Sequence, residues 1–545
     1  MARASLISCA FGLTRLCIVL AAVLAIGGAN AALAAPVGSH IKLPTGSIRT
    51  VERDAQGVLA FKGIPYAAPP VGPLRWRPPM RALNWSGVRD ASIFGTRCWA
   101  PSLQGPAQLS GPASEDCLTL NIWTAAQSSD QKLPVMVWIH GGGFQFGASS
   151  EPNTAGTGFA QKGVVLVSLN YRLGIFGFLA HPALDQEGSP SGDFGLQDQI
   201  AGLKWIRANI ARFGGDPGNI TIFGESAGAM SVGLLMTSPL AKGLFKKAIQ
   251  ESGAFWDSER GSIRTHAEAI ARGRALADQL SHGSIDELRA IPTEVLGEQT
   301  AWNLKQDPTT DAFSPSIDGY VLQDSPARVF AQGRQADVPL LAGWNGAEGF
   351  IFMNRSLPHA SAAEFRSAAA TTFGQGRLTD FLSAYPADTD ATATSSAEAL
   401  TGDLIIAEQV WACLQTDRRT GKAPVFAYQF NYHSAYSPIP IHTADINFVF
   451  GLLTPVKMLH GGAPGSRDRE LASQMISYWV NFARTGNPNG PDLPTWPAYQ
   501  NDSPQVMLFD TVTRAVPQSG TVRFRFIESF RRNGRLPESW SQPPK

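Results

Sequence analysis

Short runs of apolar residues, many of them β-branched or aromatic, recur along the 545-residue chain. Runs of this length and composition are typical of strands buried on both faces of a sheet. They lie at residues 133–139, 164–169, 219–223, 338–343, 424–430 and 505–509. Between them, apolar residues recur at helical spacing, as in 194–213 and 467–484. Strands that alternate with helices predict an α/β fold, in which helices flank a large and mostly parallel central sheet.

Two polar, helix-rich stretches interrupt this alternation, at about residues 257–335 and 360–420. In the first, Thr265 and Glu268 form a capping-box pattern that predicts the start of a helix. A chain of this length is by default expected to form two domains. However, the sequence contains no internal repeat and no linker that would free a second domain. We therefore predict a single domain over residues 35–545, with both stretches as helical insertions.

The N-terminus carries the pattern of a secretory signal peptide. Basic residues precede an apolar run at 16–26, which is too short to span a bilayer. Small-residue cleavage sites follow, so we expect residues 1–34 to be removed by cleavage near Ala31 or Ala34. An uncleaved membrane anchor is the alternative. The signal predicts a secreted or periplasmic protein, and its compact, alanine-rich form favours bacterial export.

Composition and charge exclude several classes of partner. Hydrophobic residues make up 44% of the chain and charged residues 16%, which is typical of a globular protein with a large core. The formal net charge of +1 gives no sign of a nucleic-acid or anionic-membrane partner. No segment after the signal is apolar for long enough to span a bilayer. We therefore expect no stable membrane association after cleavage, and no feature predicts an oligomeric state.

Export also changes the interpretation of the five cysteines. Cys9 and Cys17 lie in the signal, so Cys98, Cys117 and Cys413 remain. In an oxidising compartment, one disulfide and one free thiol are expected from three cysteines. Cys98 and Cys117 bracket a loop rich in Pro, Gly, Ser and Gln. We favour a bridge that tethers this loop over three reduced, buried thiols.

The most informative stretch is 219–233, which reads NITIFGESAGAMSVG. An apolar strand leads into G-x-S-x-G, and small apolar residues suited to a packed helix follow. This is the context of a nucleophile elbow, in which a strained turn exposes the serine, here Ser226. The turn also places Ser226 at a helix N-terminus, where backbone N–H groups favour a developing negative charge. Ser226 is therefore the candidate nucleophile.

A second glycine-rich segment follows the apolar run at 133–139 and reads HGGGF, residues 140–144. Consecutive glycines after a buried strand leave backbone N–H groups accessible. On a parallel-sheet scaffold of this kind, such a loop and the residue after the nucleophile form the oxyanion hole. A flexible turn is the simpler interpretation of three glycines, but their position ahead of G-x-S-x-G favours the oxyanion hole. His140 is expected to orient the loop rather than act as the base.

A serine hydroxyl needs a base within hydrogen-bond reach and an acid that orients this base. On this scaffold the chain order is Ser, then Asp or Glu, then His. His442 lies on a loop beyond a late strand and is the candidate base, whereas its nearest rival, His433, lies almost at the strand end. Glu348 lies in a glycine-flanked loop after another strand and is the candidate acid, with Asp318 as the runner-up.

Taken together, the motifs resemble those of the type B carboxylesterase and cholinesterase family of the α/β-hydrolases. The resemblance extends from about residue 40 to about residue 510. It rests on segments in the family's order, namely GIPYAAPPVGPLR, EDCLTLNIW, HGGGF, NYRLGIFGF, GLQDQ, FGGDPGNITIFGESAGAMSV, PSIDG, AEG, HTADINFVFG and NFARTGNPN. It implies an α/β-hydrolase fold with helical insertions over the active site, and carboxylic ester hydrolysis without a metal or cofactor.

The resemblance also implies roles for individual residues. The implied catalytic residues are Ser226 as nucleophile, Glu348 as acid and His442 as base. The implied oxyanion-hole donors are the N–H groups of Gly142, Gly143 and Ala227.

Further residues match structural features of the family. The matching pairs are the first disulfide, Cys98–Cys117, and the buried ion pairs Arg75–Glu115 and Arg172–Asp198. There are also departures: Asp193 stands where the family usually has Asn, and Ala347 where an acidic residue commonly precedes the Glu. Neither departure removes a catalytic group.

The expected activity is hydrolysis of a small-molecule carboxylic ester through an acyl-enzyme intermediate. The same machinery acting on a carbamate, amide, thioester or lactone is the alternative, because loops form the pocket. A binding protein is a third hypothesis, since the family includes cell-adhesion members that have lost the nucleophile. The presence of Ser226, Glu348 and His442 argues against it.

Overall fold

The computed structural model describes residues 36–100, 111–254, 263–300, 313–454 and 461–533. The predicted signal peptide, residues 1–34, and its cleavage sites at Ala31 and Ala34 lie outside the described residues. Within those ranges, no helix combines the length and the apolar character needed to cross a membrane.

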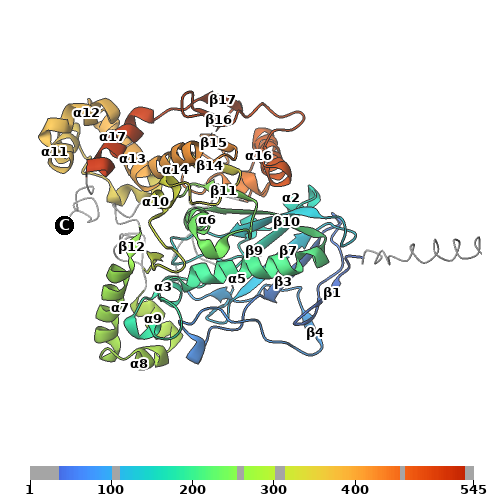
Figure 1. Ribbon diagram of the computed structural model, residues 1–545. Helices are drawn as coiled ribbons and strands as arrows, with labels where there is room; N and C mark the ends of the chain where they lie inside the picture. The colour runs from blue at the N-terminus through green and yellow to red at the C-terminus, as the bar shows by residue number, and fades with distance from the viewer. Residues whose placement is uncertain (1–35, 101–110, 255–262, 301–312, 455–460, 534–545) are drawn as a thin grey trace, which may run out of the picture.

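A ten-stranded sheet runs through the centre of the protein (Figure 1). In spatial order its strands are β17 (Arg514–Pro517), β16 (Gln505–Phe509), β15 (Val425–Phe430), β14 (Leu340–Asn345), β11 (Lys247–Glu251), β10 (Gly215–Glu225), β8 (Leu133–Ile139), β9 (Val165–Leu169), β7 (Thr119–Thr124) and β3 (Leu59–Pro65). The strands from β16 to β9 pair in parallel, and the pairings toward both edges are antiparallel. The predicted α/β fold with a mostly parallel sheet is confirmed.

The six apolar runs of the sequence coincide with strands of this sheet, and one of the runs is displaced. The run at 338–343 is displaced, because β14 begins only at Leu340. Pro339 has no N–H to donate, so it cannot supply a ladder hydrogen bond at that point. The edge strand β17 was not predicted, since its residues are exposed or half-buried and carry no apolar run.

Side chains of the strands alternate between two separate cores. In β8, Val135, Val137 and Ile139 belong to one apolar cluster, whereas Met136 and Trp138 belong to another. Alternate residues of a strand point to opposite faces of the sheet, so each cluster covers one face. Most strands between the two cores are therefore continuous apolar runs, whereas β11 carries the buried polar residues Gln250 and Glu251 near its end.

Different helices cover the two faces (Figure 1). The first cluster includes residues of α5 (Phe194–Asn209), α6 (Ala227–Thr237) and α14 (Glu408–Thr420). The second includes residues of α2 (Thr157–Gln161), α15 (Ile446–Val449) and α16 (Ser466–Thr485). The helices predicted over 194–213 and 467–484 thus correspond to α5, with the short 3₁₀ turn that follows it, and to α16.

The two stretches predicted as insertions are helical. The first forms α7 (His266–Ser281), α8 (Ile285–Ala290), α9 (Thr293–Gln299) and α10 (Pro326–Ala331). The second forms α11 (Ala362–Phe373), α12 (Leu378–Ala384) and α13 (Asp390–Gly402), which pack with the C-terminal α17 (Thr521–Asn533) in a third apolar cluster. The capping box at Thr265 and Glu268 starts α7, as predicted.

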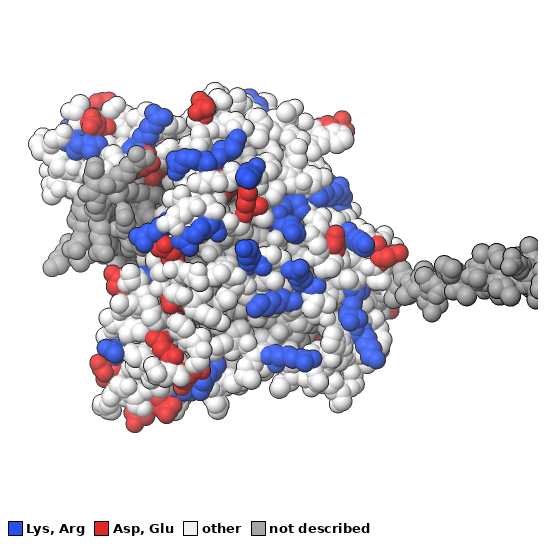
Figure 2. Space-filling view, viewed as in Figure 1, with Lys and Arg blue, Asp and Glu red and all other residues white. Residues whose placement is uncertain are grey.

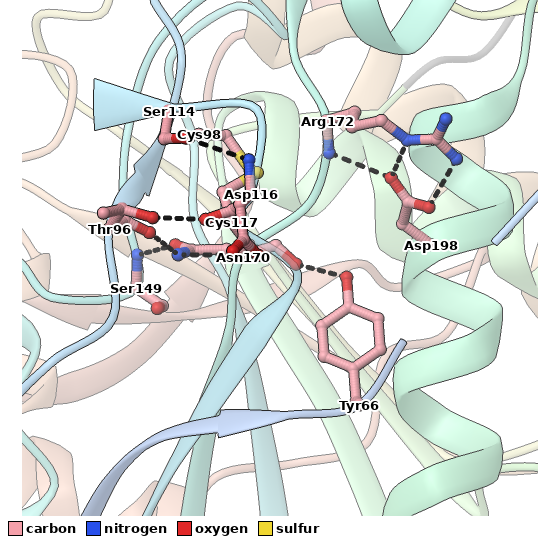
Figure 3. The surroundings of a disulfide bond; sticks show 10 residues. All are labelled: Tyr66, Thr96, Cys98, Ser114, Asp116, Cys117, Ser149, Asn170, Arg172 and Asp198. Carbon is pink, nitrogen blue, oxygen red and sulfur yellow. Dashed lines mark hydrogen bonds and ion pairs between the residues drawn. A yellow bond between two sulfur atoms is a disulfide. The ribbon is translucent and has the colours of Figure 1, made fainter. Parts of the chain in front are cut away.

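The remaining α-helices and sheets of the described residues are short. They are the helices α3 (Gly174–Phe178) and α4 (Pro182–Asp185), and three small sheets: β1 (His40–Leu43) with β2 (Gly46–Arg49) and β4 (Val88–Asp90), β5 (Arg97–Cys98) with β6 (Ala113–Ser114), and β12 (Arg264–Thr265) with β13 (Ser316–Ile317). The predicted disulfide joins Cys98 at the end of β5 to Cys117 (Figure 3), and Cys413 is a free, buried thiol.

Two predicted ion pairs are buried beside this disulfide region. Arg172 binds Asp198 through two contacts of 2.7 Å, from Nε and Nη2 (Figure 3). Arg75 binds Glu115 in the same two-pronged manner, at 2.9 and 2.5 Å. Bidentate geometry of this kind satisfies both carboxylate oxygens, which a buried ion pair requires. Both pairings are confirmed.

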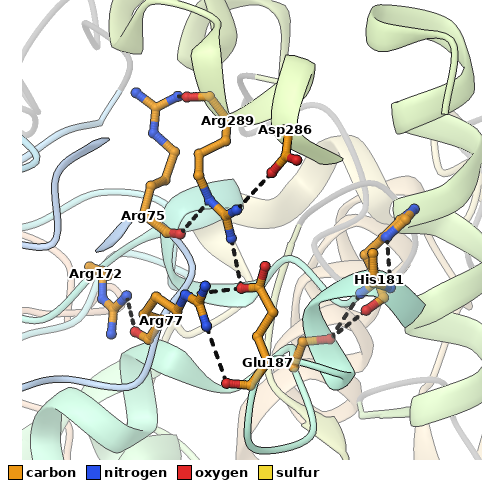
Figure 4. Close-up of polar contacts among 9 residues, drawn as sticks. Arg75, Arg77, Arg172, His181, Glu187, Asp286 and Arg289 are labelled. Atoms are coloured by element: carbon orange, nitrogen blue, oxygen red, sulfur yellow. Dashed lines mark hydrogen bonds and ion pairs between the residues drawn. The ribbon is translucent and has the colours of Figure 1, made fainter. Parts of the chain in front are cut away.

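A network of arginines attaches the first insertion to the body of the protein. Arg289 of α8 reaches the Glu187 carboxylate at 2.8 Å and the Arg75 carbonyl at 3.2 Å (Figure 4). Arg77 contacts the same Glu187 carboxylate at 3.0 Å. Because one carboxylate receives two arginines from different segments, α8 is fixed against the segment that carries Arg75.

Charged side chains of both signs lie on the viewed surface (Figure 2). Acidic side chains gather over α7 and α8, where Asp286 and Glu287 occupy the first turn of α8. Acidic residues at a helix N-terminus complement the helix dipole. The near-neutral total charge thus conceals local concentrations of charge.

Asp193 and Asp318 bring two buried carboxyl groups together at the start of α5. Asp193 accepts the N–H of Ser316 at 3.0 Å, and Asp318 accepts the N–H groups of Tyr320 and Leu322. Burial, reinforced by repulsion from Asp318, raises the pKa of the Asp193 carboxyl well above its ordinary value.

We expect Asp193→Asn to stabilise the protein selectively at higher pH. When folding raises the pKa of a carboxyl, the free energy of unfolding of the protein falls as the pH rises from the unfolded pKa, about 4, toward the folded pKa. An amide has no such loss. Urea unfolding at pH 5 and pH 8 measures the effect, with Asp286→Asn as the exposed control. An advantage of Asp193→Asn that does not grow between these pH values would contradict the interpretation.

Candidate active site

Ser226 stands at the turn between β10 and α6. Its backbone has φ 55° and ψ −124°, a conformation that non-glycine residues seldom adopt and that costs about 1–3 kcal/mol. The Ser226 N–H donates to the Glu251 carbonyl on the neighbouring strand β11 at 2.9 Å, which holds the turn against the sheet. The predicted strand, strained turn and helix are therefore all present.

The glycines on either side of Ser226 leave no room for a side chain. A Cβ atom on Gly224 would lie 2.5 Å from the carbonyl oxygen of Ile139, and one on Gly228 would lie 2.0 Å from the same oxygen. Ile139 is the last residue of β8. The turn can approach the end of β8 this closely only because both positions lack a Cβ atom.

The loop after β8 lies directly against the nucleophile position. A Cβ atom on Gly141 would be 3.1 Å from the Ser226 Cβ atom. Gly142 and Gly143 have φ values of 104° and 60°, in the region that favours glycine. Ala227 is the first residue of α6. The three predicted oxyanion-hole donors thus belong to two segments that meet at Ser226, and their catalytic role stays a prediction.

His140 supports the start of this loop. The Tyr171 hydroxyl donates to the His140 carbonyl at 2.9 Å, and the two rings stack with centroids 4.5 Å apart. Burial lowers the pKa of the His140 imidazole to about 4. A buried, neutral ring that packs under the loop agrees with an orienting role and not with that of a base.

His442 and Glu348 come together although 94 positions separate them in the chain. The Nδ1 atom of His442 lies 2.6 Å from the Oε2 atom of Glu348, and both side chains are buried. An Nδ1–H that donates to a carboxylate fixes the tautomer and leaves Nε2 free to accept a proton. This is the arrangement required of a base and its orienting acid.

Asn345 connects the loops that carry these two residues. Its backbone N–H donates to the Oε1 atom of Glu348 at 2.6 Å, and its side-chain amide donates to the Ile441 carbonyl at 2.9 Å. Thr443, on the other side of His442, has φ 77°, a strained value for a β-branched residue. The hydrogen bonds of Asn345 before His442 and the strained backbone of Thr443 after it thus restrict the position of the imidazole.

The rival residues lie elsewhere. His433 is exposed, and its Nδ1 atom contacts the Pro438 carbonyl at 2.9 Å. Asp318 accepts backbone N–H groups of its own turn and faces Asp193 rather than His442. Neither residue joins the cluster around Ser226, so Glu348 and His442 remain the candidates.

Two neighbours of His442 were not identified from the sequence. The Oε1 atom of Glu225, the residue before the nucleophile, lies 3.2 Å from His442 Nε2. The Phe352 ring lies 5.4 Å from the imidazole, between centroids. The position of Glu225 at the end of a central parallel strand, where functional residues gather, is the signal that could have indicated it.

Opposing effects act on the ionisation of this cluster. Burial by itself lowers the pKa of His442, but the nearby carboxylates, Glu225 and Glu348 first, outweigh burial and raise it above its ordinary value. Burial raises the pKa of Glu225, and the His442 ring opposes that rise. The two groups therefore compete for protons across their 3.2 Å contact.

Within the described ranges, no cluster of three or more His, Cys, Asp or Glu side chains has the geometry of a metal site. Glu225, the residue before Ser226, and Glu348 contact the two ring nitrogens of His442. The chemistry that this arrangement can perform directly is nucleophilic attack by a serine assisted by a base.

Comparisons with known proteins agree with this geometry. The family model described as the carboxylesterase family matches residues 38–524. Fumonisin B1 esterase of Sphingopyxis macrogoltabida is 37% identical over 480 residues, which cover 85% of each chain. Para-nitrobenzyl esterase of Bacillus subtilis (strain 168) is 35% identical over 84% of this chain and 92% of its own.

A solved structure matches most of the chain. A structure titled PNB esterase superposes with a TM-score of 0.75 at 32% identity and covers 90% of this chain and 99% of its own. The named relatives are esterases, so both sequence and structure point to hydrolysis of carboxylic esters. The chain belongs to the carboxylesterase family of carboxylic ester hydrolases, with an α/β-hydrolase fold.

Proposed function

We propose that the protein hydrolyses a small-molecule carboxylic ester through an acyl-enzyme intermediate, with Ser226, His442 and Glu348 as its catalytic triad. The observation that carries the proposal is the buried 2.6 Å contact between His442 and Glu348, together with the 3.2 Å contact of His442 Nε2 with Glu225, the residue before the strained Ser226. Each of the three residues is the type that the corresponding role requires.

In the first half of the reaction, His442 Nε2 removes the proton of the Ser226 hydroxyl as its oxygen attacks the ester carbonyl. The N–H groups of Gly142, Gly143 and Ala227 stabilise the tetrahedral oxyanion. His442 then donates its proton to the leaving alcohol, and Ser226 carries the acyl group. In the second half, His442 removes a proton from a water molecule, which attacks the acyl group on Ser226 and releases the carboxylic acid.

The rival hypotheses are that the protein cleaves a bond other than an ester, or that it binds a partner without catalysing a reaction. A carbamate, amide, thioester or lactone would use the same residues, so the triad alone does not distinguish these substrates from esters. A binding protein has no need of a serine held in a costly backbone conformation. The strain at Ser226 therefore favours a catalytic function.

Replacement of the nucleophile is the first test. We expect Ser226→Ala to lose at least about 10⁴-fold in kcat on p-nitrophenyl esters, because the acyl-enzyme can no longer form. A series from acetate to palmitate measures this and sizes the acyl pocket. The control is an unchanged thermal melting curve for the variant. A folded Ser226→Ala protein with wild-type turnover would refute the proposed triad.

The pH dependence is the second test. Since only neutral His442 can accept the serine proton, kcat/KM should rise with pH as this residue loses its proton. The carboxylates around His442 raise its pKa, so the midpoint should lie above the ordinary imidazole value, about 6.5. Initial rates on a neutral ester across the pH range measure it. A midpoint at or below about 6.5 would contradict the electrostatics of the site.

We further propose that the single domain 35–545 acts in the periplasm or outside the cell, after removal of residues 1–34. The signal pattern supports export, and the Cys98–Cys117 disulfide suits an oxidising compartment. Intact-mass analysis of the protein from the periplasm and the medium should give a chain that begins after Ala31 or Ala34. A full-length chain confined to the membrane fraction would indicate the uncleaved anchor instead.

A further inference from the structure

Glu225, Glu251, Gly343 and Tyr428 form one row across four neighbouring strands, β10, β11, β14 and β15. Residues in one row of a sheet point to the same face, here the face covered by α16. A Cβ atom on Gly343 would lie 2.2 Å from the Tyr428 ring, so the ring covers the space that a side chain would occupy. Glu251 and Tyr428 are therefore brought together across Gly343.

The Glu251 carboxyl is fully buried in this row. Its Oε1 atom accepts the indole N–H of Trp479 from α16 at 2.6 Å. Its Oε2 atom has no hydrogen-bond partner among the described residues. A buried carboxylate oxygen without a donor is costly, whereas a protonated oxygen can itself donate.

Asp445 is the second carboxyl of the group and lies three positions after His442. It accepts the Tyr428 hydroxyl at 2.6 Å and the Asn345 side-chain amide at 3.1 Å, so each of its oxygens has a donor. The Tyr428 and Trp479 rings pack edge to face at 5.4 Å, which makes the donors of the two carboxyl groups neighbours. Asp445 is also the charge that acts most strongly on Glu251, followed by Glu225.

Ionisation of both buried carboxyl groups is unfavourable, because the negative charge of Asp445 raises the pKa of Glu251. Asp445 has donors on both oxygens, which stabilise its charged form. Glu251 has an unpartnered oxygen and lacks a cation among the groups that act on it. The proton therefore belongs on Glu251.

We propose that Glu251 is a positioning residue of the esterase site: its buried carboxyl carries a proton, so that of the two carboxyl groups Glu251 and Asp445 only Asp445 adds a negative charge to the surroundings of His442. The backbone carbonyl of the same residue holds the N–H of Ser226. Glu251 thus links the turn that carries Ser226 to Asp445, which acts on His442. The inference rests on the proposed triad, since it concerns the ionisation of His442.

The titratable groups that face this pair come from each element packed around it. They are Glu225 on β10, Tyr428 on β15, Glu348 after β14, and His442, while α16 contributes the non-titrating Trp479. A charge on Glu251 would add one more anion beside Asp445 and Glu225, which both act on His442, and would favour the protonated form of the base.

The decisive experiment compares Glu251→Gln with Asp445→Asn. Glutamine keeps the acceptor for Trp479 and replaces the O–H donor by an N–H donor, so the midpoint of the acid limb of kcat/KM should stay at the wild-type pH. Asp445→Asn removes a charge and should lower that midpoint by about one unit. If Glu251→Gln lowers the midpoint as far as Asp445→Asn does, Glu251 is an anion and the proposal is wrong.

Infrared spectroscopy provides a second, direct readout. The C=O stretch of a protonated carboxylic acid should be weaker in Glu251→Gln than in the wild type at neutral pH. Equal band intensities would overturn the proposal, since Glu251 would then carry no proton to lose. This readout does not depend on turnover.

Glu251→Leu tests the positioning role, because leucine can neither accept the Trp479 indole N–H nor carry a proton. We expect kcat to fall about 10- to 100-fold with little change in KM, and Glu251→Gln to restore most of it. Wild-type kcat in folded Glu251→Leu would overturn the proposal. The matched control is Gln250→Leu, the adjacent buried residue on the opposite face of β11, which should leave the pH midpoint in place.

These outcomes separate this inference from the proposed function. Turnover that survives Ser226→Ala would refute the triad whatever the Glu251 variants do. An inactive Ser226→Ala together with a shifted Glu251→Gln midpoint would refute only the role of Glu251. Should Glu251→Leu fail to fold, the comparison of Glu251→Gln with Asp445→Asn still decides.

Discussion

The structure depends on one close approach, that of the turn around Ser226 to the end of β8. The carbonyl oxygen of Ile139 lies where a Cβ atom of either Gly224 or Gly228 would be. This contact brings the strained serine and the glycine loop together. The serine follows β10, the loop follows β8, and these two strands are neighbours in the sheet. The strain at Ser226 persists since the surrounding sheet and helix determine the backbone at this point.

A second constraint follows from what gathers at these strand ends. Glu225, Glu348 and Asp445 are buried and act on His442, and Glu251 is buried beside Glu225 and Asp445. Desolvation opposes the charge of each group. Donors from β14, β15 and α16 compensate for part of this cost, through Asn345, Tyr428 and Trp479. The sheet thus supplies the electrostatic environment of the base as well as its position.

Much of the fold and of the site follows from local sequence. Most strands that lie between the two cores are apolar throughout, so runs such as 133–139 identify them without further information, whereas the polar residues of β11 leave it without such a run. The glycines around Ser226 and after His140 are also local signals, because a backbone conformation or a close approach requires them there. Edge strand β17 escaped prediction for the opposite reason: with one side toward solvent, it needs no apolar run.

The sequence by itself determined the kind of elements, their order, the nucleophile turn and the glycine loop, since each depends on neighbours within a few residues. Only the tertiary structure decided that Glu225, Glu251 and Tyr428 share one row, that Asn345 joins the loops of Glu348 and His442, and that Asp193 faces Asp318. The reason is physical. Periodicity records which face of a strand is buried, whereas strand order and register record which distant segments become neighbours, and these depend on the packing of the whole sheet.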